Sequence, residues 1–384
     1  MEVNELENHI RTLATLEEDA SPVISCYLNL SGGPAGCREP LNVRLQTLRK
    51  LFPPRQTAAF DQAAEGIRAY LNDSISPRSQ GVAAFSRGGP NPFWLALQFE
   101  VPLPTWIAAG STPNIYHLVE LKDNYDRFAI LLTTETSVRI IGVNLGSVTE
   151  QLWQARPDLR RRAGHDWSRD HFQDHRRERT RQFVHDQVRL LDRVVSAGGY
   201  GHIILAGNAR MIAAVRKELP KRLAAMLVDA VPAAATDQVS DIVASTLLSF
   251  LEHEEMESQA VAEKLIAQIR THGLAVAGSR PTLEAIRVGQ ADVLVLTADY
   301  EPGQGWECRN CAHLELELPP PRNCPSCGAP GIREFDIRGE MVRLAGSRDV
   351  PCEVVEHNDA LMSLGGAGCL LRYQAPANYW RSAA

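Results

Sequence analysis

Four cysteines in the last quarter of the chain constrain its fold more tightly than any other feature. The chain has 384 residues and 8 cysteines, too few for a disulfide scaffold, yet these four fall within twenty positions. They form two pairs, with two residues inside each pair and twelve between the pairs: Cys308, Cys311, Cys324 and Cys327. Four thiolates at this spacing can close tetrahedrally on zinc at about 2.3 Å each. We therefore predict a zinc ribbon over residues 306–330, with Zn²⁺ as the cofactor.

The composition of the cysteine cluster also predicts what the metal would do. Because all four ligands are Cys, no coordination position is left for water, and the zinc is expected to be structural. Gly328 directly follows the second pair and permits a tight backbone turn there. A disulfide pair and a chance cluster remain the alternative interpretations.

The net charge of the chain hides a basic segment. Lys plus Arg total 40 and Asp plus Glu total 46, which gives a formal net charge of −6. Residues 156–193, however, hold 11 Arg against 7 acidic residues, and Trp167 and Phe172 stand among them. Guanidinium groups neutralise phosphates and exposed aromatic rings stack on bases, so this composition is typical of a nucleic-acid-binding loop. A solvated helix face with i,i+4 ion pairs is the competing interpretation. The candidate RNA-binding residues are Arg160, Arg161, Arg162, Arg169, Arg176, Arg177 and Arg181.

Alternating strand and helix patterns indicate a multidomain protein of α/β and α+β class. At about 100 to 200 residues per domain, the length predicts two or three domains. The composition, 44% hydrophobic and 22% charged, can supply each domain with a core. We predict three domains: an N-terminal α+β domain at 1–116, an α/β domain with the basic loop at 117–253, and a C-terminal α/β domain at 254–384 that carries the zinc ribbon as an insertion.

Several local patterns define these domains. The Pro- and Gly-rich residues 101–114 are expected to form a linker. Residues 127–133 and 137–143 are expected to be adjacent strands that lead into the Arg-rich loop, and a helix is expected from about Arg176. Residues 237–253 are expected to form a helix that ends at the boundary of the last domain.

The sequence lacks the motifs of several other protein classes. No apolar run approaches the 18 residues of a membrane span, and the N-terminus lacks the basic and then apolar order of a secretory signal. We therefore expect a cytoplasmic protein with no membrane partner, and we expect a monomer. The chain has neither the phosphate-binding loop of an ATPase nor the nucleophile elbow of a serine hydrolase.

Three stretches in order along the chain resemble one family, the archaeal and eukaryotic class-1 peptide release factors with their paralogue Pelota. Residues 117–253 resemble the second domain of that family: two strands, a basic loop, a long helix and then HIILAGNARM at 202–211. The last domain resembles the third domain, with AGSRPTLEAIRVGQADVLVLT at 277–297, then the cysteine pairs, then EHNDALMSLGGAGCLLRY at 356–373. The resemblance implies the three-domain α/β fold of that family.

The chain departs from this family at two motifs. Release-competent members carry Gly-Gly-Gln at the tip of the basic loop, and no Gly-Gly-Gln occurs here. The family's Asn-Ile-Lys-Ser motif for stop codons is also missing, because Asn114 and Ile115 are not followed by Lys and Ser. The matching loop tip resembles the Gly-Trp-Ser-like tip of the divergent bacterial, Balon-like branch of the superfamily. It consists of Gly164, His165, Asp166, Trp167 and Ser168.

The resemblance implies a ribosome-binding translation factor that occupies the tRNA (A) site, of rescue or hibernation type and without catalytic residues. The implied partners are the ribosome, through its rRNA and tRNA site, and a translational GTPase of elongation factor Tu type. One alternative is a peptide-release factor that hydrolyses peptidyl-tRNA with a variant loop tip, where His165 beside Asp166 orients a water. Another alternative is a general RNA-binding module without preference for ribosomes.

Overall fold

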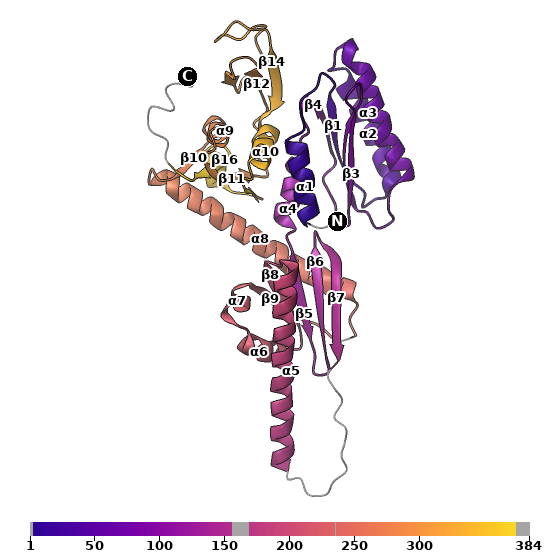
Figure 1. Ribbon diagram of the computed structural model, residues 1–384, viewed down its shortest axis with the longest axis vertical. Helices are drawn as coiled ribbons and strands as arrows, with labels where there is room; N and C mark the ends of the chain where they lie inside the picture. Colours follow the sequence, from indigo (N-terminus) through magenta and orange to yellow (C-terminus); the bar gives the residue numbers. More distant parts are fainter. Residues whose placement is uncertain (1–2, 156–168, 235, 374–384) are drawn as a thin grey trace. The chain divides into compact units, whose positions relative to one another are not determined.

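The computed structural model describes most of the chain as helices and strands (Figure 1). The described residues are 3–155, 169–234 and 236–373, and their side chains are described except at 150, 153–155 and 169–177. No helix among these residues is long and apolar enough to cross a membrane.

Contacts along the chain define two compact units. Unit 1 combines Met1–Asn124 with Glu255–Ala384, and unit 2 is Tyr125–Glu254, which is therefore an insertion into unit 1 in sequence. The fold is a mixed α/β multidomain fold, as the sequence predicts. The boundaries of the three predicted domains stay a prediction.

Unit 2 is built on a five-stranded sheet with the order β7-β6-β5-β8-β9. Its strands are β5 Phe128–Thr133, β6 Ser137–Asn144, β7 Ser147–Ala155, β8 His202–Gly207 and β9 Leu227–Pro232. The β5–β6 and β6–β7 pairs are antiparallel, whereas β5–β8 and β8–β9 are parallel. The two predicted strands are confirmed as β5 and β6. A third strand, β7, follows where the sequence predicts only the basic loop.

Helices cover both faces of this sheet. They are α5 Arg169–Gly198, α6 Ala209–Glu218, α7 Lys221–Ala225 and the first half of α8 Val239–Arg270. Side chains alternate along β5. Ala129 and Leu131 pack with α5 and α6 on one face, whereas Phe128, Ile130 and Leu132 pack with α8 on the other face. Phe128 stacks on Phe250 of α8 with ring centroids 4.5 Å apart. Unit 2 therefore has one cluster of buried side chains on each face of its sheet.

Two predictions about helices need correction. α5 begins at Arg169 and not near Arg176. α8 does not end at residue 253 but continues to Arg270. Residues 239–270 contain no Gly or Pro, so nothing in the sequence stops the helix there.

The first sheet of unit 1 is antiparallel, with the order β3-β2-β1-β4. The elements of this part are α1 Val3–Ala14, β1 Val23–Asn29, α2 Pro34–Arg49, α3 Pro54–Asp73, β2 Gly81–Arg87, β3 Phe93–Phe99, β4 Trp106–Gly110 and α4 Tyr116–Asn124. Buried side chains of α2 and α3 pack on one face of the sheet. The prediction of a linker at 101–114 is wrong, because Trp106–Gly110 pairs with β1 as an edge strand.

The second sheet of unit 1 has the order β10-β16-β11-β15, and only its β11–β15 pair is parallel. Its part of the chain holds β10 Ala275–Ala277, α9 Ser279–Arg287, β11 Ala291–Thr297, α10 Ile337–Ser347, β15 Cys352–Val355, α11 Asp359–Ser363 and β16 Ala367–Leu371. Between β11 and α10 the chain forms a small third sheet, β13-β12-β14. Its strands are β12 Gln304–Cys308, β13 Leu314–Glu315 and β14 Ile332–Asp336.

Candidate metal centre and basic helix

The four cysteines lie in two backbone turns of the same form. In the first turn the Ala312 N–H donates to the carbonyl of Cys308 at 2.9 Å, and in the second the Gly328 N–H donates to the carbonyl of Cys324 at 2.8 Å. The residue after the second cysteine of each pair has a positive φ, 58° at Ala312 and 73° at Gly328. Each turn therefore carries its two cysteines in the same backbone conformation.

The sulfur atoms of these cysteines come together. The Sγ atoms of Cys308 and Cys327 are 3.6 Å apart, as are those of Cys311 and Cys324. All four ligand atoms lie within 4.8 Å of one another. Four sulfurs around a tetrahedral zinc with bonds of about 2.3 Å would be about 3.8 Å apart. The donor set and its spacing thus fit a zinc ion of structural type.

Local hydrogen bonds favour the thiolate form of one cysteine. The backbone N–H of Ala329 and the side-chain amide of Asn310 lower the pKa of Cys327 to about 6. The amide nitrogen of Asn310 lies 3.5 Å from this sulfur. The thiolate is the form of cysteine that binds a metal. Cys308 and Cys324 are buried, whereas Cys311 and Cys327 are exposed.

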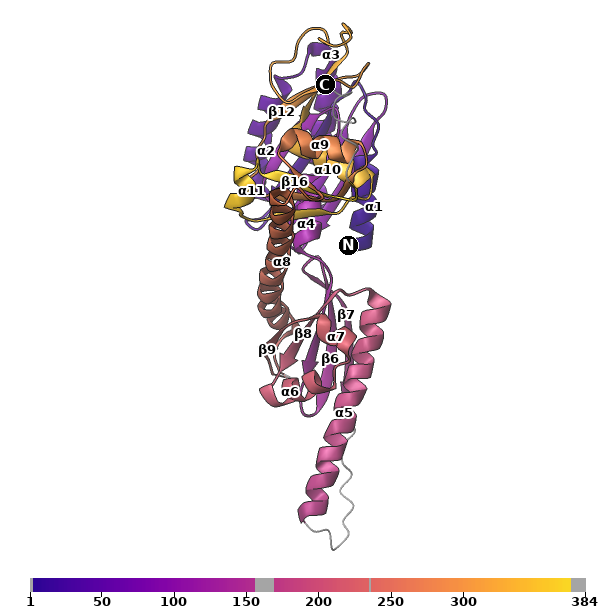
Figure 2. The same ribbon diagram turned by 90° about the vertical axis from the view of Figure 1, so that its left-hand side faces the viewer.

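Helix α5 carries part of the predicted basic segment. Its C-terminal part packs on the sheet of unit 2 through Phe183, Val184, Val188, Leu191, Val194 and Val195. Its N-terminal part extends beyond the ends of the strands (Figure 2). The opposite side of the packed part is polar and exposes Arg189 and Arg193. An amphipathic helix of this kind positions basic side chains on a rigid element.

The predicted RNA-binding residues are only partly described. Arg181 lies on α5 and is exposed. Arg169, Arg176 and Arg177 lie on the same helix, but their side chains are outside the described set. Arg160, Arg161, Arg162 and the loop tip Gly164, His165, Asp166, Trp167 and Ser168 lie outside the described residues.

Two arginines extend the basic surface beyond the predicted set. Arg189 and Arg193 are four residues apart, so they are neighbours on the surface of the helix, and Arg181 lies about two turns before Arg189. Among the described side chains, no carboxylate forms an ion pair with any of these three arginines. Arg222 of α7, by contrast, pairs with Asp192. The i,i+4 spacing was the sequence signal that could have found the two additional residues.

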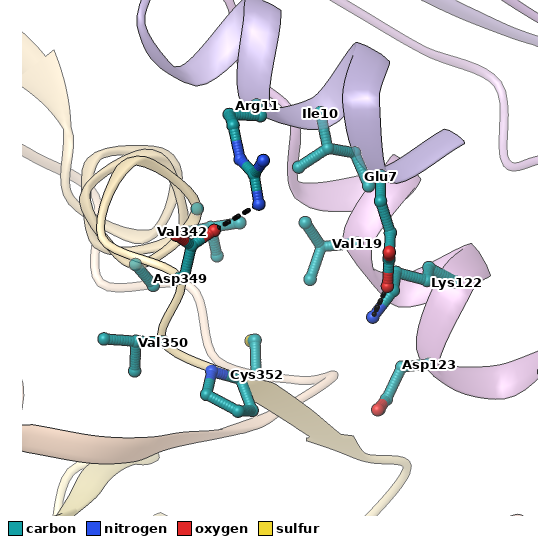
Figure 3. A pocket seen from close by; sticks show the side chains of 13 residues that line it. Glu7, Ile10, Arg11, Val119, Lys122, Asp123, Val342, Asp349, Val350 and Cys352 are labelled. Atoms are coloured by element: carbon teal, nitrogen blue, oxygen red, sulfur yellow. Dashed lines mark hydrogen bonds and ion pairs between the residues drawn. The ribbon is translucent and has the colours of Figure 1, made fainter. Parts of the chain in front are cut away.

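A cavity of about 260 Å³ lies within unit 1, between α1, α4, α10 and the start of β15 (Figure 3). Apolar side chains in its lining are Ile10, Val119, Val342 and Val350. Arg11 points to Asp349 at 2.6 Å, and Lys122 pairs with Glu7 at 3.1 Å. Asp123 accepts a hydrogen bond from the backbone N–H of Val354 at 2.7 Å. The charged groups of this cavity therefore serve the packing of residues 1–124 on 255–384.

Part of the chain is similar to proteins of one superfamily. Residues 113–250 match the family model "Bacterial archaeo-eukaryotic release factor family 10". Peptide chain release factor subunit 1 of Pyrococcus abyssi is 25% identical over 142 residues, which cover 32% of this chain and 34% of the relative. These matches relate part of the chain to the release factor and Pelota superfamily. It matches only about a third of the length of these curated relatives.

A second curated relative and two solved structures also align with the chain. The release factor subunit 1 of Thermococcus onnurineus is 25% identical over 150 residues, which cover 34% of this chain and 36% of the relative. The crystal structure of an archaeal translation termination factor aligns with 97% of this chain and 99% of its own, at 14% identity and a TM-score of 0.28. The crystal structure of Pelota from Archaeoglobus fulgidus aligns with 97% of this chain and 92% of its own, at 12% identity and a TM-score of 0.35.

The segment that matches the family model includes one of the two candidate sites. Residues 113–250 include the sheet of unit 2 and the whole of α5. The four cysteines lie outside that segment. The basic helix therefore lies inside the matched segment, whereas the metal centre lies outside it and depends on its own geometry.

Proposed function

We propose that the protein is a translation factor that binds the ribosome and occupies the tRNA (A) site, of rescue or hibernation type. The observation that carries this proposal is the set of exposed arginines on α5, which carry no ion pair to a described carboxylate and lie inside the segment that matches a release factor family. Exposed guanidinium groups on a helix suit contacts with the phosphates of rRNA. The absence of Gly-Gly-Gln from the sequence favours a role without peptide release.

In this proposal the loop tip, the other arginines of the basic segment and the C-terminal part of the chain each contact a different site or partner. The loop tip at 164–168 approaches the peptidyl-transferase region from the end of α5, and Arg160 to Arg162 with Arg169, Arg176 and Arg177 add phosphate contacts. The C-terminal part of the chain has an excess of acidic residues, 18 against 12 basic residues over 254–384. This excess disfavours rRNA and favours a protein partner, for which we propose a translational GTPase of elongation factor Tu type.

We further propose that the four cysteines bind a structural zinc ion. The support is the distance of 3.6 Å between paired sulfurs and the identical form of the two turns. Bound zinc would stabilise the small sheet β13-β12-β14, which consists of short strands. Cys308, Cys311, Cys324 and Cys327 would hold it, and no water position would remain. Elemental analysis of the purified chain should give one zinc per protein, and a Cys311→Ser, Cys327→Ser variant should give none.

The ribosome proposal is tested by cosedimentation. The triple variant R181Q, R189Q and R193Q should bind purified ribosomes more weakly than the unaltered protein. The slope of log affinity against log salt concentration should flatten by about 2, because about 0.7 counterions are released per neutralised phosphate on single-stranded nucleic acid. A matched control, R38Q, R55Q and R78Q, removes three exposed arginines outside the matched segment and should leave that slope unchanged.

The outcomes of this test separate the alternatives. Unaltered protein that does not cosediment with ribosomes would contradict the proposal. Equal affinity for ribosomes and for a single-stranded RNA of mixed sequence would favour a general RNA-binding module. Release of labelled peptide from stalled ribosomes above the buffer background would favour the peptide-release alternative.

A further inference from the structure

A buried arginine beside the cysteine cluster connects distant parts of unit 1. Arg333 lies on β14, and only 7% of it is exposed. Its guanidinium group donates to three carboxylates: Glu18 at 2.8 Å, Glu307 at 3.0 Å and Glu340 at 2.7 Å. Glu18 follows α1, Glu307 lies on β12 and Glu340 lies on α10. One side chain thus joins the N-terminal segment, the small sheet and the C-terminal domain.

Each of the three carboxylates also binds a second arginine. The pairs are Glu18 with Arg309 at 3.0 Å, Glu307 with Arg287, and Glu340 with Arg343 at 2.8 Å. Burial would raise the pKa of Glu340, but hydrogen bonds and charges of Arg343 and Arg333 hold that pKa below its usual value. A cavity of about 450 Å³ opens among these residues, with Cys308 in its wall. Every carboxylate of this network therefore bridges two guanidinium groups.

The cysteine cluster and this network share one short stretch of the backbone, residues 307–309. Cys308 stands between Glu307 and Arg309, which are both network members. Glu307 lies directly opposite Arg333 in the β12–β14 ladder, and the Arg309 N–H donates to the carbonyl of Gly331 at 2.8 Å. A ligand that fixes Cys308 therefore also fixes the two residues that hold Arg333 and Glu18 in place.

The N-terminal segment depends on these contacts at its end. The Glu18 carboxylate pairs with Arg333 on β14 and with Arg309 in the turn after β12. Just before it, the carbonyl of Ala14 accepts from Arg343 at 3.1 Å. Arg333 and Glu340 are buried, so removal of a partner from either would leave an uncompensated charge, and the network therefore favours a single arrangement of these segments.

We propose that metal binding by the four cysteines and docking of the N-terminal segment around Glu18 on the C-terminal part are energetically coupled through Arg333. This inference rests on the proposal that the cysteines bind a metal. Coupling between two equilibria is reciprocal, so docking strengthens metal binding by the same factor by which the metal strengthens docking. The metal centre then holds two halves of unit 1 together, beyond its local effect on the small sheet.

The test uses the full-length protein loaded with zinc. Glu18→Gln removes the charge from the N-terminal end of the network and leaves the cysteines and Arg333 intact. It should speed the transfer of zinc to a chromogenic chelator about tenfold, within the usual range of coupling between sites. The matched control is Glu17→Gln, an exposed neighbour without an ion pair. This control should release zinc at the rate of the unaltered protein.

Hydrogen–deuterium exchange provides the second measurement. Chelation of zinc from the unaltered protein should raise deuterium uptake in peptides that cover residues 10–22, and E18Q should show raised uptake there with zinc bound. Uptake at 10–22 that does not respond to chelation, or equal zinc release by E18Q and E17Q, would overturn the coupling. A rise that extends over residues 23–73 would also overturn it, because it would indicate general unfolding. Protein that holds no zinc at all would refute the metal site itself, which is a separate result.

Discussion

Ala312 and Gly328 occupy the same position in the two cysteine turns, but only the glycine suits the positive φ of that position. Both have a positive φ, at 58° and 73°. A residue with a Cβ atom is less stable in this region by about 1–2 kcal/mol, and glycine is not. Ala312→Gly should therefore raise the free energy of unfolding by about 0.5–1 kcal/mol, after subtraction of the entropy that glycine adds to the unfolded chain. Denaturant titration of the zinc-loaded protein measures this change.

Gly328→Ala is the reverse control. A Cβ atom at Gly328 would meet no other atom within 4 Å, so the substitution changes backbone preference alone. It should lower the free energy of unfolding by about 0.5–1 kcal/mol. Two substitutions that shift stability in the same direction would show that the turns do not share the described conformation.

At the residue scale, the sequence predicts local clusters and misses distant ones. The cysteines were found because their spacing is short and regular, and the structure brings their sulfurs together as predicted. The zinc ion itself stays a prediction. Arg333 and its partners could not be found, because Glu18, Glu307 and Glu340 are far apart in sequence and meet only in the folded chain. Single charged residues carry no periodic signal that would identify them.

Two glycines of α10 have opposite roles in that helix. A Cβ atom at Gly346 would lie 3.5 Å from Ala14 and 3.5 Å from Ile115, which is ordinary contact between α10 and the N-terminal segment. Alanine also favours the helix over glycine, by up to about 1 kcal/mol in a helix interior. Gly346→Ala should therefore raise the thermal unfolding temperature of the protein, with a gain of about 0.5 kcal/mol near this helix end.

Gly339→Ala in the same helix should have the opposite effect. Its Cβ atom would lie 2.6 Å from the Asn114 amide and 2.8 Å from the Asp336 carboxylate, which caps α10. Such overlap should lower the free energy of unfolding by about 1–3 kcal/mol. Thermal melts of both variants measure the contrast. A gain in stability from Gly339→Ala would contradict the described packing of residues 114 and 336.

At the element scale, errors of sequence prediction come from strands and helices whose partners are distant. β4 lies in a Pro- and Gly-rich stretch, and it is a strand only because β1 offers an edge to pair with. β7 was missed for the same reason, since its partner β6 completes its hydrogen bonds. For α8, the sequence prediction ends the helix at residue 253, in its acidic centre, although no residue there terminates a helix. The buried strand β5 is predicted correctly, because its apolar run needs no partner to be recognised.

Each of the two units has its own core of buried side chains, and this determines which fragments of the chain should fold alone. The two clusters of buried side chains in unit 2 are drawn from residues 128–250 alone. In unit 1, by contrast, the N-terminal segment shares its contacts with the C-terminal part. Gly346 of α10 lies against Ala14, Ile10 and Ile115, and Arg343 binds the carbonyl of Ala14. Residues 1–124 therefore depend on a partner surface that residues 255–373 supply.

A fragment of residues 125–254 should accordingly fold by itself. We expect a single cooperative thermal transition by circular dichroism and dispersed amide signals by NMR, because the sheet keeps the helices on both of its faces. A fragment of residues 1–124 should be less stable than the same region in the full chain, because α1 loses its contacts with α10 and the ion pairs of Glu18. Co-expression with residues 255–384 should restore part of this stability by mass action. A fragment 1–124 that unfolds as cooperatively and at the same temperature as the full chain would contradict the two-unit division and favour three independent domains.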